Sequence, residues 1–124
     1  LENYGLARVI LIPKEAPRGS GFPLALGIKA KAKGSRVFLI TERESFKIHS
    51  RELQTAFRYN LGICSMVIPE QDKLAESEPD LARLAKSLGV KGLAIQEPIE
   101  EINEELLGEA FELESGLLLE VRGF

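Results

Sequence analysis

Five basic side chains gather in the first third of the sequence, and three of them have a spacing that could bind phosphates. Lys29, Lys31 and Lys33 occupy every second position. In a β-strand such residues point to one side, about 6–7 Å apart, which suits successive phosphates of a nucleic-acid strand. Arg36 in the following turn and Arg18 in the preceding loop would extend the row. We predict that these five residues bind nucleic acid; the alternative is a solvated strand face whose lysines block edge-to-edge aggregation.

The other reactive side chains are few. His49 is the only histidine and Cys64 the only cysteine, so the chain can build neither a His/Cys zinc site nor an internal disulfide. His49 lies in a polar stretch and is expected at the surface, whereas Cys64 lies in an apolar strand and is expected to be a buried, inert thiol. The glycine-rich loop 18–21 precedes a strand pattern, not a helix start, so we expect a connecting loop and no phosphate cradle.

Composition and charge define the class of protein but not its partner. The chain has 124 residues, 44% of them hydrophobic and 28% charged, which excludes wholesale disorder and predicts one domain, 1–124, of a longer protein. Residues 1–68 hold eleven basic and five acidic side chains, and residues 69–124 hold five and fourteen. Asparagine and glutamine are scarce, as in thermophile proteins. No apolar run could span a membrane, and the single cysteine favours a cytoplasmic location.

The periodicity of apolar residues predicts nine elements. Three strands come first, at 7–13, 24–33 and 36–42, and the four consecutive apolar residues of the third indicate a central strand. Helices and strands then alternate: helix 50–60, strand 63–68, helix 81–88, strand 90–96, helix 99–111 and strand 117–121. A meander followed by alternating units predicts a three-layer α/β domain with a mixed central sheet flanked by helices.

The first half of the chain resembles the restriction-endonuclease-like nucleases, in particular the archaeal Holliday junction resolvases. The resemblance is carried by residues 4–9, 19–20, 23–26 and 37–43. It implies a hairpin that holds a metal through an Asp and a Glu, with a Lys nearby. Leu24, Thr41 and Arg43 occupy these three positions, so the resemblance implies a vestigial active site without metal, cofactor or catalysis.

These patterns together predict a catalytically inactive nuclease-like domain. It would bind nucleic acid, or scaffold a nucleic-acid-processing protein, in DNA repair or processing. One alternative is a protein-interaction or oligomerisation module that uses the acidic helix 99–111. Another is a Rossmann-like regulatory domain that binds no nucleic acid. A third is an active metal-dependent nuclease built from Glu15, Glu42 and Glu44.

Overall fold

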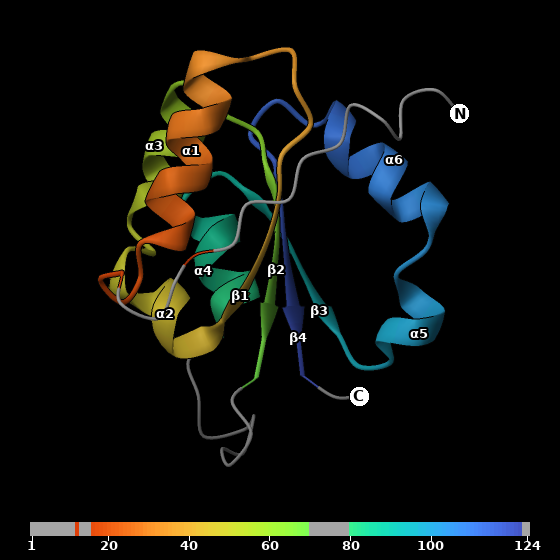
Figure 1. Ribbon diagram of the computed structural model, residues 1–124. Helices are drawn as coiled ribbons and strands as arrows, with labels where there is room; N and C mark the ends of the chain where they lie inside the picture. The colour runs from red at the N-terminus through yellow and green to blue at the C-terminus, as the bar shows by residue number, and fades with distance from the viewer. Residues whose placement is uncertain (1–11, 13–15, 70–79, 123–124) are drawn as a thin grey trace.

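The protein is built around one parallel β-sheet. The structure, a computed structural model, describes residues 12, 16–69 and 80–122 (Figure 1). Its four strands are β1 (Phe38–Glu42), β2 (Cys64–Ile68), β3 (Lys91–Ile95) and β4 (Leu117–Val121). They lie in the order β1-β2-β4-β3, and each neighbouring pair is parallel. All four carboxyl ends therefore meet at one edge of the sheet.

Helices cover both faces of the sheet and complete a three-layer fold (Figure 1). Four helices pack on one face: α1 (Gly21–Lys31), α2 (Arg43–Ile48), α3 (Glu52–Arg58) and α4 (Leu81–Ser87). The other face is covered by α5 (Pro98–Glu101) and α6 (Glu104–Glu112). Two apolar clusters lie between these layers, one built around Phe22, Phe46 and Leu118, and the other around Leu117 and Leu119.

The placement of α5 and α6 follows from the strand order. The chain moves from β1 to β2 and on to β3 in one direction across the sheet, and then steps back to β4. Parallel crossovers are almost always right-handed, so a step in the reverse direction must carry its helices over the opposite face. The last crossover therefore covers the face that the first two leave open, and both faces of β4 become buried.

The predicted α/β class with three layers is confirmed, but the prediction of a mixed sheet is wrong. The segment 24–33, expected as a hairpin strand, belongs mostly to α1. Its apolar residues alternate, yet Phe22, Ala25 and Leu26 also follow the spacing of one helix face, and these three are the buried ones. Without the hairpin, every strand pair of the described sheet is parallel.

The remaining described elements match the sequence with three differences, the first of which is the helix α2 (Arg43–Ile48), which was not predicted. The strands at 36–42, 63–68, 90–96 and 117–121 are present, as are helices within 50–60 and 81–88. However, β1 lies at an edge of the sheet and not at its centre, and Ile40 on its outer face is 59% exposed. The acidic helix 99–111 is two helices, because the side chain of Asn103 accepts a hydrogen bond from the Leu106 backbone and starts α6 anew.

Two further expectations concern a strand near the N-terminus and segments that could span a membrane. The predicted strand 7–13 lies outside the described residues except for Ile12. Within the part of the chain that the structure describes, no helix has both the length and the apolar character to cross a membrane.

Candidate functional site

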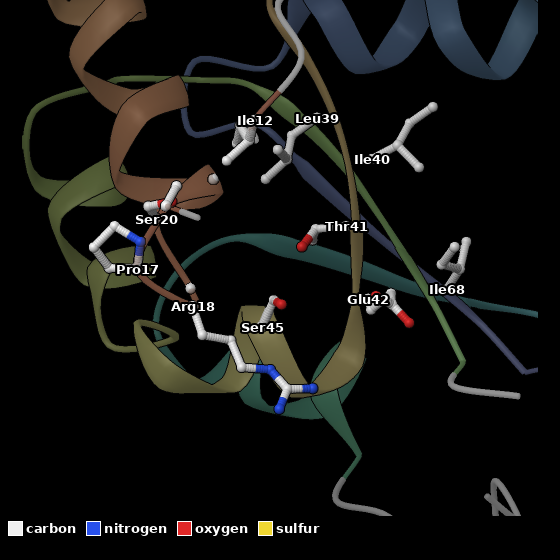
Figure 2. Close-up of a pocket in the computed structure, with 13 residues that line it drawn as sticks. Ile12, Pro17, Arg18, Ser20, Leu39, Ile40, Thr41, Glu42, Ser45 and Ile68 are labelled. Atoms are coloured by element: carbon white, nitrogen blue, oxygen red, sulfur yellow. The ribbon is translucent and has the colours of Figure 1, made fainter. Parts of the chain in front are cut away.

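An open pocket of about 540 Å³ lies where β1 ends and α1 begins (Figure 2). The carboxyl edge of a parallel sheet is where α/β proteins commonly bind ligands, because loops there can open around a crevice. The pocket is lined by the loop before α1, by the second half of β1, by the start of α2 and by the end of β2. Its lining residues are Ile12, Ala16, Pro17, Arg18, Gly19, Ser20, Gly21, Leu39, Ile40, Thr41, Glu42, Ser45 and Ile68.

The loop 18–21 forms one wall of the pocket and leads directly into α1. The expectation that a strand follows this loop is therefore wrong, and the N-terminus of α1 directs its backbone N–H groups toward this end. Gly19 has φ +86°, and a Cβ at this residue would lie 2.8 Å from Cβ of Ile48. Only glycine fits this close approach of the loop to α2.

Three of the residues that line the pocket, Ser20, Thr41 and Ser45, carry hydroxyl groups. Figure 2 shows the hydroxyls of Thr41 and Ser45 on the side of β1 that faces the loop with Arg18 and Ser20. The Ser20 side chain makes no capping hydrogen bond to α1. A pocket with hydroxyls, a guanidinium and a helix N-terminus can hold a small polar or anionic molecule. Glu42, at the end of β1, contributes a carboxylate to the same pocket.

Beside this pocket, a buried ion cluster joins three elements. Arg43 and Glu120 have side-chain exposures of 2% and 0%, and Arg43 Nη1 donates to Glu120 Oε2. Glu120 Oε2 also accepts from Arg122 Nη2 at 3.2 Å, and Glu120 Oε1 accepts from the Ala82 backbone N–H at 3.0 Å. Glu120 therefore connects the start of α2, the start of α4 and the end of β4.

Two side chains have shifted pKa values with a clear physical cause. The Asp80 carboxylate caps α4 and accepts a hydrogen bond from the Arg83 backbone N–H at 2.9 Å, which lowers the pKa of Asp80. Burial raises the pKa of the Cys64 thiol from 9.0 to about 11. The prediction of a buried thiol is therefore confirmed.

The five basic residues do not form the row that the sequence suggested. Lys29 and Lys31 lie in the last turn of α1, and Lys33 follows it, so the spacing of a strand face is absent. Lys29 Nζ donates to the Ser35 carbonyl oxygen at 2.5 Å. The Arg36 guanidinium lies 5.5 Å from the centre of the Phe111 ring, a residue of α6. Arg18 lines the pocket, away from the carboxyl end of α1.

The residues of the expected vestigial nuclease site are not brought together as a hairpin would bring them. Leu24 lies on α1 and is 43% exposed. Thr41 lines the pocket, and Arg43 is buried against Glu120.

Nor do the three acids of the nuclease alternative form a metal site in the described part of the chain. Glu15 lies outside the described residues, Glu42 lines the pocket, and Glu44 pairs with Lys47 at 3.2 Å. Among the residues that the structure describes, no three His, Cys, Asp or Glu side chains form a group that could hold a metal ion.

The fold and pocket define a three-layer parallel α/β domain with a ligand-sized opening at the carboxyl edge of its sheet. No family model matches the chain. It is similar to acetolactate synthase large subunits: 33% identical to that of Buchnera aphidicola over 82% of this chain, and 32% identical to isozyme 3 of Escherichia coli over 76%. A probable large subunit from Methanococcus aeolicus is 34% identical over 71%. The chain spans about a fifth of these relatives.

Among solved structures, the chain resembles a thiamine diphosphate-dependent 4-hydroxybenzoylformate decarboxylase from Rhodococcus jostii. The TM-score is 0.61 at 18% identity, over 85% of this chain and 23% of that one. This likeness concerns the fold alone.

These relatives overturn the expected function. The resemblance to restriction-endonuclease-like nucleases is wrong, and with it the nucleic-acid-binding or scaffolding role in DNA repair or processing. The relatives equally fail to support the alternatives of an interaction module or a Rossmann-like regulatory domain. The physical reason for the error is the segment 24–33: read as a strand it completes a nuclease-like hairpin, whereas the helix α1 belongs to a parallel α/β fold.

Proposed function

We propose that this chain is one domain of an enzyme related to acetolactate synthase and to thiamine diphosphate-dependent decarboxylases. The observation that carries the proposal is 30–34% sequence identity to five acetolactate synthase large subunits over 71–82% of the chain. The parallel fold agrees with it, since a decarboxylase of this kind has a matching domain. The chain's share of the relatives' length implies that other domains complete the enzyme.

The pocket at the end of β1 is the surface through which the domain would contribute to a catalytic centre. Hydroxyls of Ser20, Thr41 and Ser45 surround it, and the N-terminus of α1 faces it. These groups suit the carboxylate and carbonyl oxygens of a 2-oxo acid, the class to which 4-hydroxybenzoylformate belongs. We therefore propose a 2-oxo acid as the substrate class of the complete enzyme.

Thiamine diphosphate would supply carbanion stabilisation in such an enzyme, but the described residues do not fit a metal-bound diphosphate. Mg²⁺ binds protein carboxylates together with phosphate oxygens. At this edge Glu120 accepts hydrogen bonds from two arginines and a backbone N–H, and Glu44 pairs with Lys47. Glu42 is the one acidic residue in the pocket lining.

Assembly with other chains is part of the proposal. The relatives are named as large subunits, which implies multi-subunit enzymes. We propose that the complete protein also associates, either with itself or with a second type of subunit. Light scattering on the complete protein should give a mass above that of one chain, and a monodisperse monomer would contradict this part of the proposal.

A pocket-filling variant tests the proposed function. The complete protein should release acetolactate or carbon dioxide from 2-oxo acids when thiamine diphosphate is supplied. Ser45→Phe places an aromatic ring in the pocket and should lower the rate by about 100-fold, since displacement of a bound substrate by about 1 Å can have that effect. Ser87→Phe is the matched control, because Ser87 is exposed near the end of α4 and does not line the pocket.

Two different outcomes would contradict the role of the pocket and the proposed function. Equal activity in Ser45→Phe and in the unmodified protein would contradict a role for this pocket. A complete protein that turns over none of the 2-oxo acids tested would contradict the proposed function.

A further inference from the structure

The Glu120 carboxylate, buried at the carboxyl edge of the sheet, accepts three hydrogen bonds from other groups of the protein. Glu120 is 0% exposed, and both its oxygens accept hydrogen bonds. One of its partners is a backbone N–H in the first turn of α4, and the other two are arginine side chains. A carboxylate in this state has its charge balanced and three of its roughly four acceptor positions occupied, so it offers little to an added cation.

Arg43 occupies the place between the strand ends where a cation would neutralise that carboxylate. It directly follows β1, and its guanidinium reaches Glu120 on β4, two strands away in the sheet. Thr41 pairs in register with Val67, and Val67 with Glu120, so the end of β1 and Glu120 lie level across the sheet. Arginine stays protonated at any accessible pH and cannot leave the site as a metal ion can.

Among the residues that the structure describes, the pocket beside the cluster offers a divalent ion a single carboxylate, that of Glu42. Mg²⁺ requires near-octahedral oxygen coordination, which proteins build from one or two carboxylates together with phosphates and water. Glu42 is an exposed carboxylate that lies directly next to buried, positively charged Arg43 in the chain. The described residues hold no group of three metal-ligating side chains.

We infer that the described part of the carboxyl edge takes up no divalent metal, and that the internal cation Arg43 joins β1, β4 and α4 there through Glu120. The inference rests on the proposed function, because it states how this edge departs from one that would hold thiamine diphosphate together with a metal ion. Arg43 and Arg122 balance the charge of Glu120, so this carboxylate needs no metal to neutralise it.

Direct cation titration tests the inference on the unmodified chain. Mn²⁺, followed by paramagnetic resonance, and Mg²⁺, followed by calorimetry, are each added alone and with inorganic diphosphate. We expect no saturable binding at millimolar metal and the same melting temperature with metal or with EDTA. Saturable binding of one metal ion per chain, or a melting temperature that EDTA lowers, would overturn the inference. The thiamine diphosphate-dependent decarboxylase of Rhodococcus jostii serves as the comparison protein.

A second arm keeps this inference separate from the proposed function. Turnover of 2-oxo acids by the complete protein is measured after removal of metal by EDTA. Turnover that persists supports both statements. Turnover that is lost with EDTA and restored by Mg²⁺ supports the proposed function. If this chain also binds Mn²⁺ in the titration, the inference is overturned. A complete protein without turnover contradicts the proposed function. The metal titration on the chain still decides the inference about divalent metal.

Discussion

The single cysteine shows how burial alone sets the chemistry of a residue. Cys64 lies on β2 with its side chain in the cluster between the sheet and α6. An apolar surrounding disfavours the charged thiolate, and this raises its pKa to about 11. Cys64 should therefore react with thiol reagents near pH 8 only as fast as the protein unfolds.

The same shift predicts a loss of stability in alkali. The unfolded thiol ionises near its ordinary pKa of 9.0, and the pKa of the folded thiol is about 11, so the folded protein binds this proton more tightly. The stability due to this difference is complete below about pH 9 and is lost as the pH rises toward 11. Urea unfolding across this range should show a steeper decline for the unmodified chain than for Cys64→Val. Identical slopes would contradict the shift.

A glycine on β3 illustrates close packing at the scale of one atom. A Cβ on Gly92 would lie 2.3 Å from the backbone oxygen of Ala82, so α4 packs directly on this strand. Gly92→Ala should lower the free energy of unfolding by several kcal/mol, since overpacking against rigid backbone costs about 1–3 kcal/mol or more. Gly27→Ala is the control: a Cβ there meets nothing within 4 Å, and in a helix it should stabilise by about 0.5–1 kcal/mol. Urea midpoints of the two variants measure the contrast.

At the scale of elements, caps decide where the helices begin. Asp80 accepts the Arg83 backbone N–H and starts α4 next to the buried cluster. Asp80→Ala should lower the free energy of unfolding by about 1 kcal/mol, and Asp80→Asn by less, because asparagine also caps well. Since the pKa of Asp80 is lowered in the folded protein, this contribution is present at neutral pH and is lost as acid protonates the carboxylate. Equal losses in the two variants would contradict a capping role.

The same elements explain which sequence patterns were informative. The strand at 117–121 and the helix at 81–88 were predicted correctly, because a continuous apolar run and a capped amphipathic stripe each allow one interpretation. The segment 21–31 allows two. Its alternation fits a strand, whereas Ala25 and Ala30, and Pro23 in the first turn, fit a helix. Packing against β1 decides in favour of the helix.

At the scale of the whole molecule, the ion pair of Arg43 and Glu120 joins residues 77 positions apart. Removal of one partner leaves the other buried without its charge balanced, so Arg43→Met should destabilise the fold by about 3–5 kcal/mol. The double variant Arg43→Met with Glu120→Leu should recover part of this loss, because both charges are then gone. Chemical unfolding followed by circular dichroism gives the three free energies. A double variant that loses the sum of two single losses would contradict mutual neutralisation.

The sequence by itself determined the class of fold, the four strands that form the sheet and the buried state of Cys64, because these depend on local runs of apolar residues. Only the tertiary structure decided the strand order, the parallel pairing of β1 and the pocket where α1 meets it. The same holds for Arg43, which lies between two glutamates in the sequence and is buried against Glu120 in the structure. The physical reason is that strand pairing and burial depend on contacts between side chains far apart in the chain. A local sequence pattern does not show which of these side chains meet.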